Sequence, residues 1–122
     1  MKKLLIIEDD KDFLWILKQG FNNQSFSVVY AENGKEGLLT AEKEKPDLIM
    51  VDILMPEMTG IEMARALKEK MGTLPPMVFL TNLKDENYIS QVMEITGGAD
   101  YIVKADMSIT AIVDRVKSKL GV

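Results

Sequence analysis

Leu4-Leu5-Ile6-Ile7-Glu8-Asp9-Asp10 is the stretch that decides the fold, because four apolar residues run directly into three carboxylates. The apolar run is too short for a buried helix, and its branched side chains favour a strand that is buried on both faces. Strands of that kind belong to parallel sheets covered by helices. The stretch therefore predicts a type of sheet and places carboxylates at its carboxyl edge.

Three more apolar runs end in a polar residue in the same way. They are Leu48-Ile49-Met50-Val51 before Asp52, Met77-Val78-Phe79-Leu80 before Thr81, and Tyr101-Ile102-Val103 before Lys104. A fifth strand is predicted over residues 26–31, where polar and apolar side chains partly alternate. Because the strands of a parallel sheet end at one edge, we expect the carboxylates, the hydroxyl and the amine to meet there.

The segments between the strands have the apolar spacing of helices. The spacing, with Gly and Pro as stop signals, predicts helices from Asp10 to about Phe21, from after Gly34 to Pro46, from after Gly60 to Gly72, from Asp85 to Ile95, and from about Met107 or Ser108 to Leu120. Strict alternation of five strands and five helices predicts an α/β fold. We expect a doubly wound parallel five-stranded sheet with helices on both faces, which makes three layers.

The first helix carries more apolar residues than one face needs. We expect Phe13, Ile16, Leu17 and Phe21 to form its buried stripe, and Leu14 and Trp15 to be partly exposed. Exposed apolar residues are common on protein surfaces. The pair is therefore interpreted either as scattered surface residues or as a docking patch for a partner.

Composition and charge exclude several classes of function. The 122 residues suit a single domain, expected over residues 1–122 with no output domain. The net charge of −4 argues against binding to nucleic acid or to an anionic membrane. No apolar stretch approaches the roughly 20 residues that cross a bilayer. The chain has no cysteine and no histidine, which excludes thiolate and imidazole metal ligands and suits a cytoplasmic location.

The carboxylates of Glu8, Asp9 and Asp52 would repel one another at one edge of the sheet, so the cluster calls for a cation. Oxygen ligands without histidine suit Mg²⁺ or Mn²⁺. Such a site is a natural place for phosphoryl transfer, with Thr81 and Lys104 available to bind phosphoryl oxygens. The Asp52 carboxylate is itself a possible nucleophile that would form an acyl phosphate.

Each of these residues also has a simpler interpretation. Asp9 or Asp10 can cap the first helix, Thr81 can be a turn hydroxyl, and Lys104 can be a solvated surface residue. For any one residue alone, the simpler interpretation is favoured. Complementary groups at four strand ends together favour a functional site.

The chain resembles the receiver domain of two-component response regulators over its whole length. The resemblance lies in Glu8-Asp9-Asp10, in the stretch Asp52-Ile53-Leu54-Met55-Pro56-Glu57-Met58-Thr59-Gly60, in Leu80-Thr81 and in Val103-Lys104. It implies the flavodoxin-like (βα)5 fold with strand order 2-1-3-4-5.

The resemblance also implies roles for the site residues. Asp52 would be the phosphoacceptor, and Thr81 and Lys104 would contact the phosphoryl oxygens. Mg²⁺ would be held by Glu8, Asp9, Asp52 and the backbone carbonyl of Leu54. Thr81 and Tyr101 would form the switch that alters the face of the fourth helix, the fifth strand and the fifth helix.

By the same resemblance the chain is a signalling protein rather than an enzyme acting on other substrates. Its phosphodonor would be a phosphohistidine on a histidine kinase or a histidine phosphotransfer protein, and its output a downstream protein target. We expect a monomer or a phosphorylation-dependent dimer. The alternative is a receiver-like module that signals by protein contact without phosphorylation.

Two departures from the family pattern have consequences. Ala105 follows Lys104 where the family usually has a proline after a cis bond, which predicts a trans bond or a rearranged loop. Leu54 and Leu83 lie two residues after Asp52 and Thr81, where the family varies its hydrolysis rate. Since neither apolar side chain can orient a water molecule, we expect slow loss of the phosphoryl group.

Two rival classes fit the sequence less well. A phosphatase or other Mg²⁺-dependent enzyme on a similar sheet needs a general acid two residues after Asp52, and Leu54 cannot serve. A nucleotide or flavin binder needs a Gly-rich or Ser/Thr-rich phosphate loop after the first strand. Glu8-Asp9-Asp10 would repel a phosphate at that position.

Overall fold

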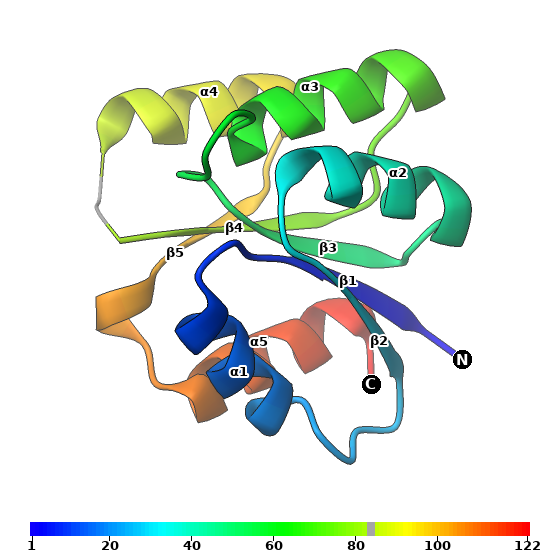
Figure 1. Cartoon of the computed structure of the whole chain (residues 1–122), viewed down its shortest axis with the longest axis vertical. Coiled ribbons are helices and arrows are strands. Elements are labelled where there is room, and N and C mark those ends of the chain that lie inside the picture. Colours follow the sequence, from blue (N-terminus) through cyan, green and yellow to red (C-terminus); the bar gives the residue numbers. More distant parts are fainter. Residues whose placement is uncertain (83–84) are drawn as a thin grey trace.

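The computed structural model describes residues 1–82 and 85–122 and has a parallel sheet between two layers of helices (Figure 1). The strands are β1 (Lys3–Ile7), β2 (Ser27–Ala31), β3 (Leu48–Asp52), β4 (Met77–Thr81) and β5 (Asp100–Val103). All four neighbouring pairs are parallel, and the order is β2-β1-β3-β4-β5. The predicted fold class and strand order are confirmed.

The helices lie close to their predicted positions. They are α1 (Lys11–Gly20), α2 (Gly34–Glu44), α3 (Gly60–Met71), α4 (Glu86–Thr96) and α5 (Ile109–Leu120), with a short 3₁₀ turn, η1 (Lys104–Asp106), after β5. In Figure 1, α2, α3 and α4 cover one face of the sheet, and α1 and α5 cover the other. Within the described residues, no helix is long and apolar enough to cross a membrane.

Each strand contributes side chains to two hydrophobic cores, because successive side chains point to opposite faces of the sheet. On β1, Leu5 and Ile7 belong to the core beneath α2, α3 and α4. Leu4 and Ile6 belong to the core beneath α1 and α5. All four side chains are fully buried, which explains why β1 reads as a continuous apolar run.

The register brings the carboxyl ends of the central strands to one level. Ile7 of β1 is paired with Val51 of β3, and Asp52 is paired with Leu80 of β4. Beyond the last pairs, the Glu8 amide donates to the Ala31 carbonyl at 3.0 Å. The strand register therefore places Glu8 and Asp52 at the same edge of the sheet.

The buried face of α1 differs from the predicted one. Leu14, expected to be partly exposed, is 4% exposed, and Ile16, expected in the buried stripe, is 40% exposed. The helix buries Leu14, Leu17 and Phe21, which are three and four residues apart and so define an equally regular stripe. The sheet face selects this stripe, and Trp15 stays 64% exposed as expected.

Candidate metal and phosphoryl site

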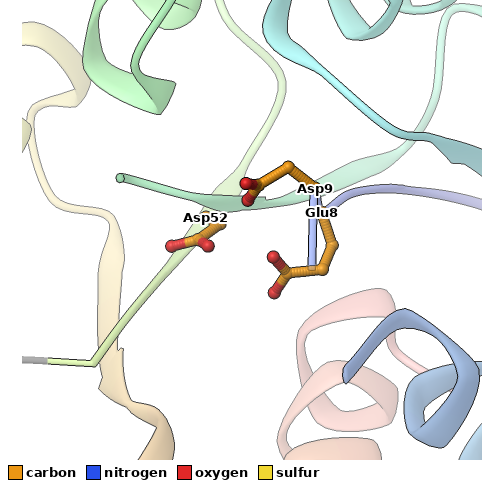
Figure 2. Close-up of side chains that lie close together, drawn as sticks. All are labelled: Glu8, Asp9 and Asp52. Atoms are coloured by element: carbon orange, nitrogen blue, oxygen red, sulfur yellow. The ribbon is translucent and has the colours of Figure 1, made fainter. Parts of the chain in front are cut away.

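Three carboxylates lie together at the carboxyl edge of the sheet. Glu8 and Asp9 come from the segment between β1 and α1, and Asp52 is the last residue of β3. One oxygen from each lies within 4.8 Å of the others. Figure 2 shows the three side chains gathered around one space. Glu8 and Asp52 are buried, and Asp9 is half-buried.

The ammonium group of Lys104 lies inside this cluster. Its Nζ is 2.6 Å from Oε1 of Glu8 and 3.2 Å from Oδ2 of Asp52. The lysine side chain is only 9% exposed, so water screens these ion pairs weakly. One internal cation therefore offsets part of the charge of the three acids.

Local backbone structure orients the carboxylates. The Asp10 amide donates to Oε2 of Glu8 at 3.2 Å, and the Leu54 amide donates to Oδ1 of Asp52 at 3.3 Å. Asp10 caps α1, since its Oδ1 accepts from the amides of Asp12 and Phe13. The capping interpretation thus applies to Asp10 and not to Asp9, whose carboxylate lies in the cluster.

The loop after β3 is packed closely behind Asp52. The Gly60 amide donates to the Ile53 carbonyl at 2.9 Å. A Cβ atom at position 60 would collide with the backbone oxygen of Asp52. Thr59 and Glu62 form a capping box at the start of α3. Only glycine fits at position 60, and the loop thereby supports the strand end that carries Asp52.

Burial is the main influence on ionisation at this site. The pKa of Glu8 rises from 4.5 to about 8, chiefly through burial and further through a hydrogen bond with Asp52, while Lys104 opposes the rise. Burial by itself would lower the pKa of Lys104, but the bonds to Glu8 and the charges of Glu8 and Asp52 outweigh it and raise this pKa. The metal-free site therefore retains an ammonium and favours a proton near Glu8.

The remaining predicted site residues lie on or next to the same strands. Thr81 is fully buried at the end of β4, and Leu54 follows Asp52 with 40% of its surface exposed. Tyr101 is half-buried on β5, opposite Phe79, and packs against the core beneath α2, α3 and α4. Leu83, for which a role in hydrolysis is expected, lies outside the described residues.

The chain turns directly after Lys104. Residues Lys104–Asp106 form η1, a turn that the sequence did not predict. No peptide bond is cis in the two described segments, which include the Lys104–Ala105 bond. The trans bond, one of the two outcomes expected from Ala105, is confirmed.

One contact at the site was not found from the sequence. Nζ of Lys104 lies 4.3 Å from the centroid of the Phe13 ring. The apolar spacing of α1 predicted Phe13 as part of a buried stripe and gave it no other role. No sequence signal connects an aromatic residue on α1 with an amine that follows β5.

The donor chemistry of the cluster fits Mg²⁺ or Mn²⁺. All three side-chain ligands are carboxylates, and the sequence contains no histidine or cysteine to compete for a softer metal. A parallel α/β sheet in the order 2-1-3-4-5 with an acidic cluster and a lysine at its carboxyl edge defines a receiver-type signalling domain.

Comparison with known proteins agrees with this class. The family model described as "Response regulator receiver domain" matches residues 4–117. The chain therefore belongs to the response regulator receiver domain family of two-component signalling. The receiver domain of the Francisella response regulator 1452 is 27% identical, with a TM-score of 0.84 over 99% of this chain and 98% of that one.

Two relatives differ in how much of their length is matched. The alkaline phosphatase synthesis transcriptional regulatory protein PhoP of Bacillus subtilis (strain 168) is 31% identical over 119 residues, which are 98% of this chain and 48% of PhoP. Protein PilH of Pseudomonas aeruginosa is 30% identical over 104 residues, 85% of this chain and 86% of PilH. The chain thus spans about half the length of PhoP and of other curated relatives that it matches.

Proposed function

We propose that Asp52 accepts a phosphoryl group from a phosphohistidine on a histidine kinase or a histidine phosphotransfer protein. One observation carries this proposal: the Lys104 ammonium lies 3.2 Å from Oδ2 of Asp52, beside two further carboxylates. A nucleophilic carboxylate, a fixed cation and oxygen ligands for a divalent metal are the groups that phosphoryl transfer needs.

In the proposed reaction an Asp52 oxygen attacks phosphorus in line with the leaving imidazole nitrogen. The bond between that oxygen and phosphorus forms, the nitrogen–phosphorus bond breaks, and the partner keeps its histidine. Glu8, Asp9, Asp52 and the Leu54 carbonyl would hold Mg²⁺, which supplies positive charge to the phosphoryl oxygens. Lys104 binds a second phosphoryl oxygen, and the Thr81 hydroxyl donates to another.

We propose that the phosphorylated state alters the face formed by α4, β5 and α5. Thr81 lies at the edge next to Asp52, and its hydroxyl moves toward the new phosphoryl oxygens. Tyr101 lies on the neighbouring strand and fills the space that the hydroxyl leaves. A downstream protein then distinguishes the two states by the shape of this face.

Loss of the phosphoryl group is proposed to be slow. The Leu54 side chain is 40% exposed two residues after Asp52, and an apolar side chain cannot orient an attacking water molecule. Leu83, for which the same role is proposed, lies outside the described residues. A Leu54→Asn variant should therefore lose the phosphoryl group faster than wild type, measured by intact mass against time.

We propose that α1 docks the phosphodonor. Trp15 is 64% exposed, and with Lys11, Leu14, Lys18 and Glu32 it lines a surface hollow of about 220 Å³. Trp15→Ala should slow phosphotransfer from a panel of purified histidine kinases and leave phosphorylation by a small acyl phosphate unchanged. Equal rates of phosphotransfer to wild type and to Trp15→Ala would show that Trp15 is a surface residue without a docking role.

We further propose that residues 1–122 act as a single cytoplasmic domain without an output domain. Support comes from the match to PilH, which covers 86% of that protein. Such a domain would act as an intermediate in a relay or by direct protein contact. Whether it is a monomer or dimerises on phosphorylation is measured by light scattering with and without beryllofluoride.

The central test uses wild type and Asp52→Asn with Mg²⁺ and acetyl phosphate. Wild type should gain the mass of one phosphoryl group, and the variant should gain none. Beryllofluoride should change Trp15 fluorescence only in wild type. Absence of any adduct in wild type would refute the proposal and favour a module that signals by contact alone.

A further inference from the structure

We propose that Phe13 is a positioning residue for Lys104. The face of its ring holds the lysine ammonium beside Asp52, which weakens metal binding and strengthens binding of the phosphoryl group. The inference rests on the proposed function of Asp52 and assigns a residue to which the family resemblance gave no role.

Among the described residues, three groups contact the ammonium, and only two of them are charged. Nζ lies 2.6 Å from Oε1 of Glu8, 3.2 Å from Oδ2 of Asp52 and 4.3 Å from the centroid of the Phe13 ring. A cation within about 6 Å of a ring centroid is attracted by the negative face of the ring. Since the lysine side chain is 9% exposed, little water competes for this attraction.

The position of the ring is fixed independently of Lys104. Phe13 is in the first turn of α1, and its amide donates to Oδ1 of Asp10 at 3.1 Å. Its half-buried ring packs against the core beneath α1 and α5. The helix cap and the core therefore preorganise the ring before the ammonium arrives.

The ring differs from the carboxylates in its response to a metal. A divalent cation on Glu8 and Asp52 would repel the ammonium and take over the charge that attracts it. The ring is neutral, so a metal does not weaken its attraction for the ammonium. An ammonium that withdraws from the metal loses its contact with the ring, and one that stays is repelled by the metal, so Phe13 opposes metal binding in either case. With metal bound, it keeps the ammonium close to Asp52, where the phosphoryl oxygens arrive.

This arrangement predicts opposite effects on two ligands. In Phe13→Leu, the Kd for Mg²⁺ measured by calorimetry should fall about two- to fivefold, the range expected for a cation–π contact. At saturating Mg²⁺, the Kd for beryllofluoride, a mimic of the phosphoryl group, should rise about two- to fivefold for the same reason. A merely loosened site would weaken both ligands.

Two variants control for loss of an aromatic side chain. Phe13→Tyr keeps an aromatic ring over the ammonium, so its Kd for Mg²⁺ and its Kd for beryllofluoride should equal those of wild type. Phe26→Leu makes the same change in the same core but before β2, at the amino end of the strands, and should leave both values unchanged. Thermal unfolding confirms that each variant is folded at the temperature of the titration.

A double-mutant cycle decides whether Phe13 acts through the lysine. In a Lys104→Met background, Phe13→Leu should have no effect on the Kd for Mg²⁺. The proposal would be overturned if Phe13→Leu changed the Kd for Mg²⁺ and the Kd for beryllofluoride in the same direction, or changed neither. It would also be overturned if the effect on the Kd for Mg²⁺ persisted in the Lys104→Met background. The Mg²⁺ measurement does not require phosphorylation, so failure of the proposed function would appear separately, as absence of an Asp52 adduct.

Discussion

Among the described residues, Lys104 and Glu8 form the shortest ion pair of this site, at 2.6 Å, although 96 positions separate them in the chain. Glu8 directly follows β1, and Lys104 directly follows β5. The ion pair joins the first and last strands of the sequence through the acidic cluster. Removal of either partner leaves a buried charge without its counterion, which is costly in a protein interior.

Replacing Lys104 by Met should destabilise the metal-free protein. We expect the free energy of unfolding to fall by about 3 kcal/mol at pH 8, the cost of breaking a buried ion pair. At pH 5 the loss should be smaller, because Glu8 takes up a proton. Urea titrations measure both values. Lys119→Met is the matched control: its exposed pair with Asp100, at 3.3 Å, should contribute less than about 1 kcal/mol. Equal losses in the two variants would contradict the prediction.

Stability of the metal-free protein should fall as the pH rises through the range set by Glu8. Burial raises the pKa of Glu8 in the folded protein from 4.5 to about 8. The folded state therefore binds a proton that the unfolded chain has released. This contribution is complete below pH 4.5 and is lost as the pH approaches about 8. Urea titrations across this range measure it, and Glu8→Gln should flatten the slope.

Binding of Mg²⁺ should strengthen with pH over the same interval. A metal ion on Glu8 must displace the proton that burial retains there. Below pH 8 the affinity should rise by up to about tenfold for each pH unit. Calorimetry in two buffers of different ionisation enthalpy would also reveal the released proton. An affinity that is flat between pH 6 and 8 would show that Glu8 is already ionised in the metal-free site.

Asp9 and Asp10 should differ sharply despite being neighbours. Asp10→Ala removes the cap of α1 and should lower the free energy of unfolding by about 1 kcal/mol. Asp9→Ala should leave the cap intact and abolish measurable Mg²⁺ binding, because the cluster loses one of its three carboxylates. Urea titration and calorimetry on both variants separate the two effects. A larger loss of stability in Asp9→Ala would reverse the assignment.

Gly60→Ala should disturb the end of β3. The added Cβ would collide with the backbone oxygen of Asp52, and overpacking of this kind costs about 1–3 kcal/mol. Because the shifted atom belongs to Asp52, phosphorylation by acetyl phosphate should slow as well. Ala66→Gly on the same helix is a useful control for helix propensity, since it should lower stability without changing the rate of phosphorylation.

The strands and the acidic cluster could be predicted because their signals are local. Each central strand is an apolar run ended by a polar residue, and parallel strand ends share an edge. Glu8, Asp9 and Asp52 therefore meet as the sequence predicted, while their roles stay proposals. The buried face of α1 was predicted correctly at Leu17 and Phe21 and wrongly at Leu14 and Ile16, since both of the latter complete regular stripes and only the sheet selects between them.

The contact of Phe13 with Lys104 could not be predicted for a different reason. It depends on how far α1 leans over the strand ends and on the turn that follows β5, and neither has a local signature. Ala105 indicated only that the loop departs from the family pattern. It gave no indication of the 3₁₀ turn over Lys104–Asp106.

The position of Lys104 bears on whether the chain folds before or after it binds a metal ion. Many small metalloproteins fold only when their ion binds, because the free energy of metal binding supplies their free energy of folding. Here the chain brings its own cation to Glu8 and Asp52. We therefore expect the chain to fold before any metal binds, so that a newly synthesised molecule would reach its folded shape even where magnesium is scarce.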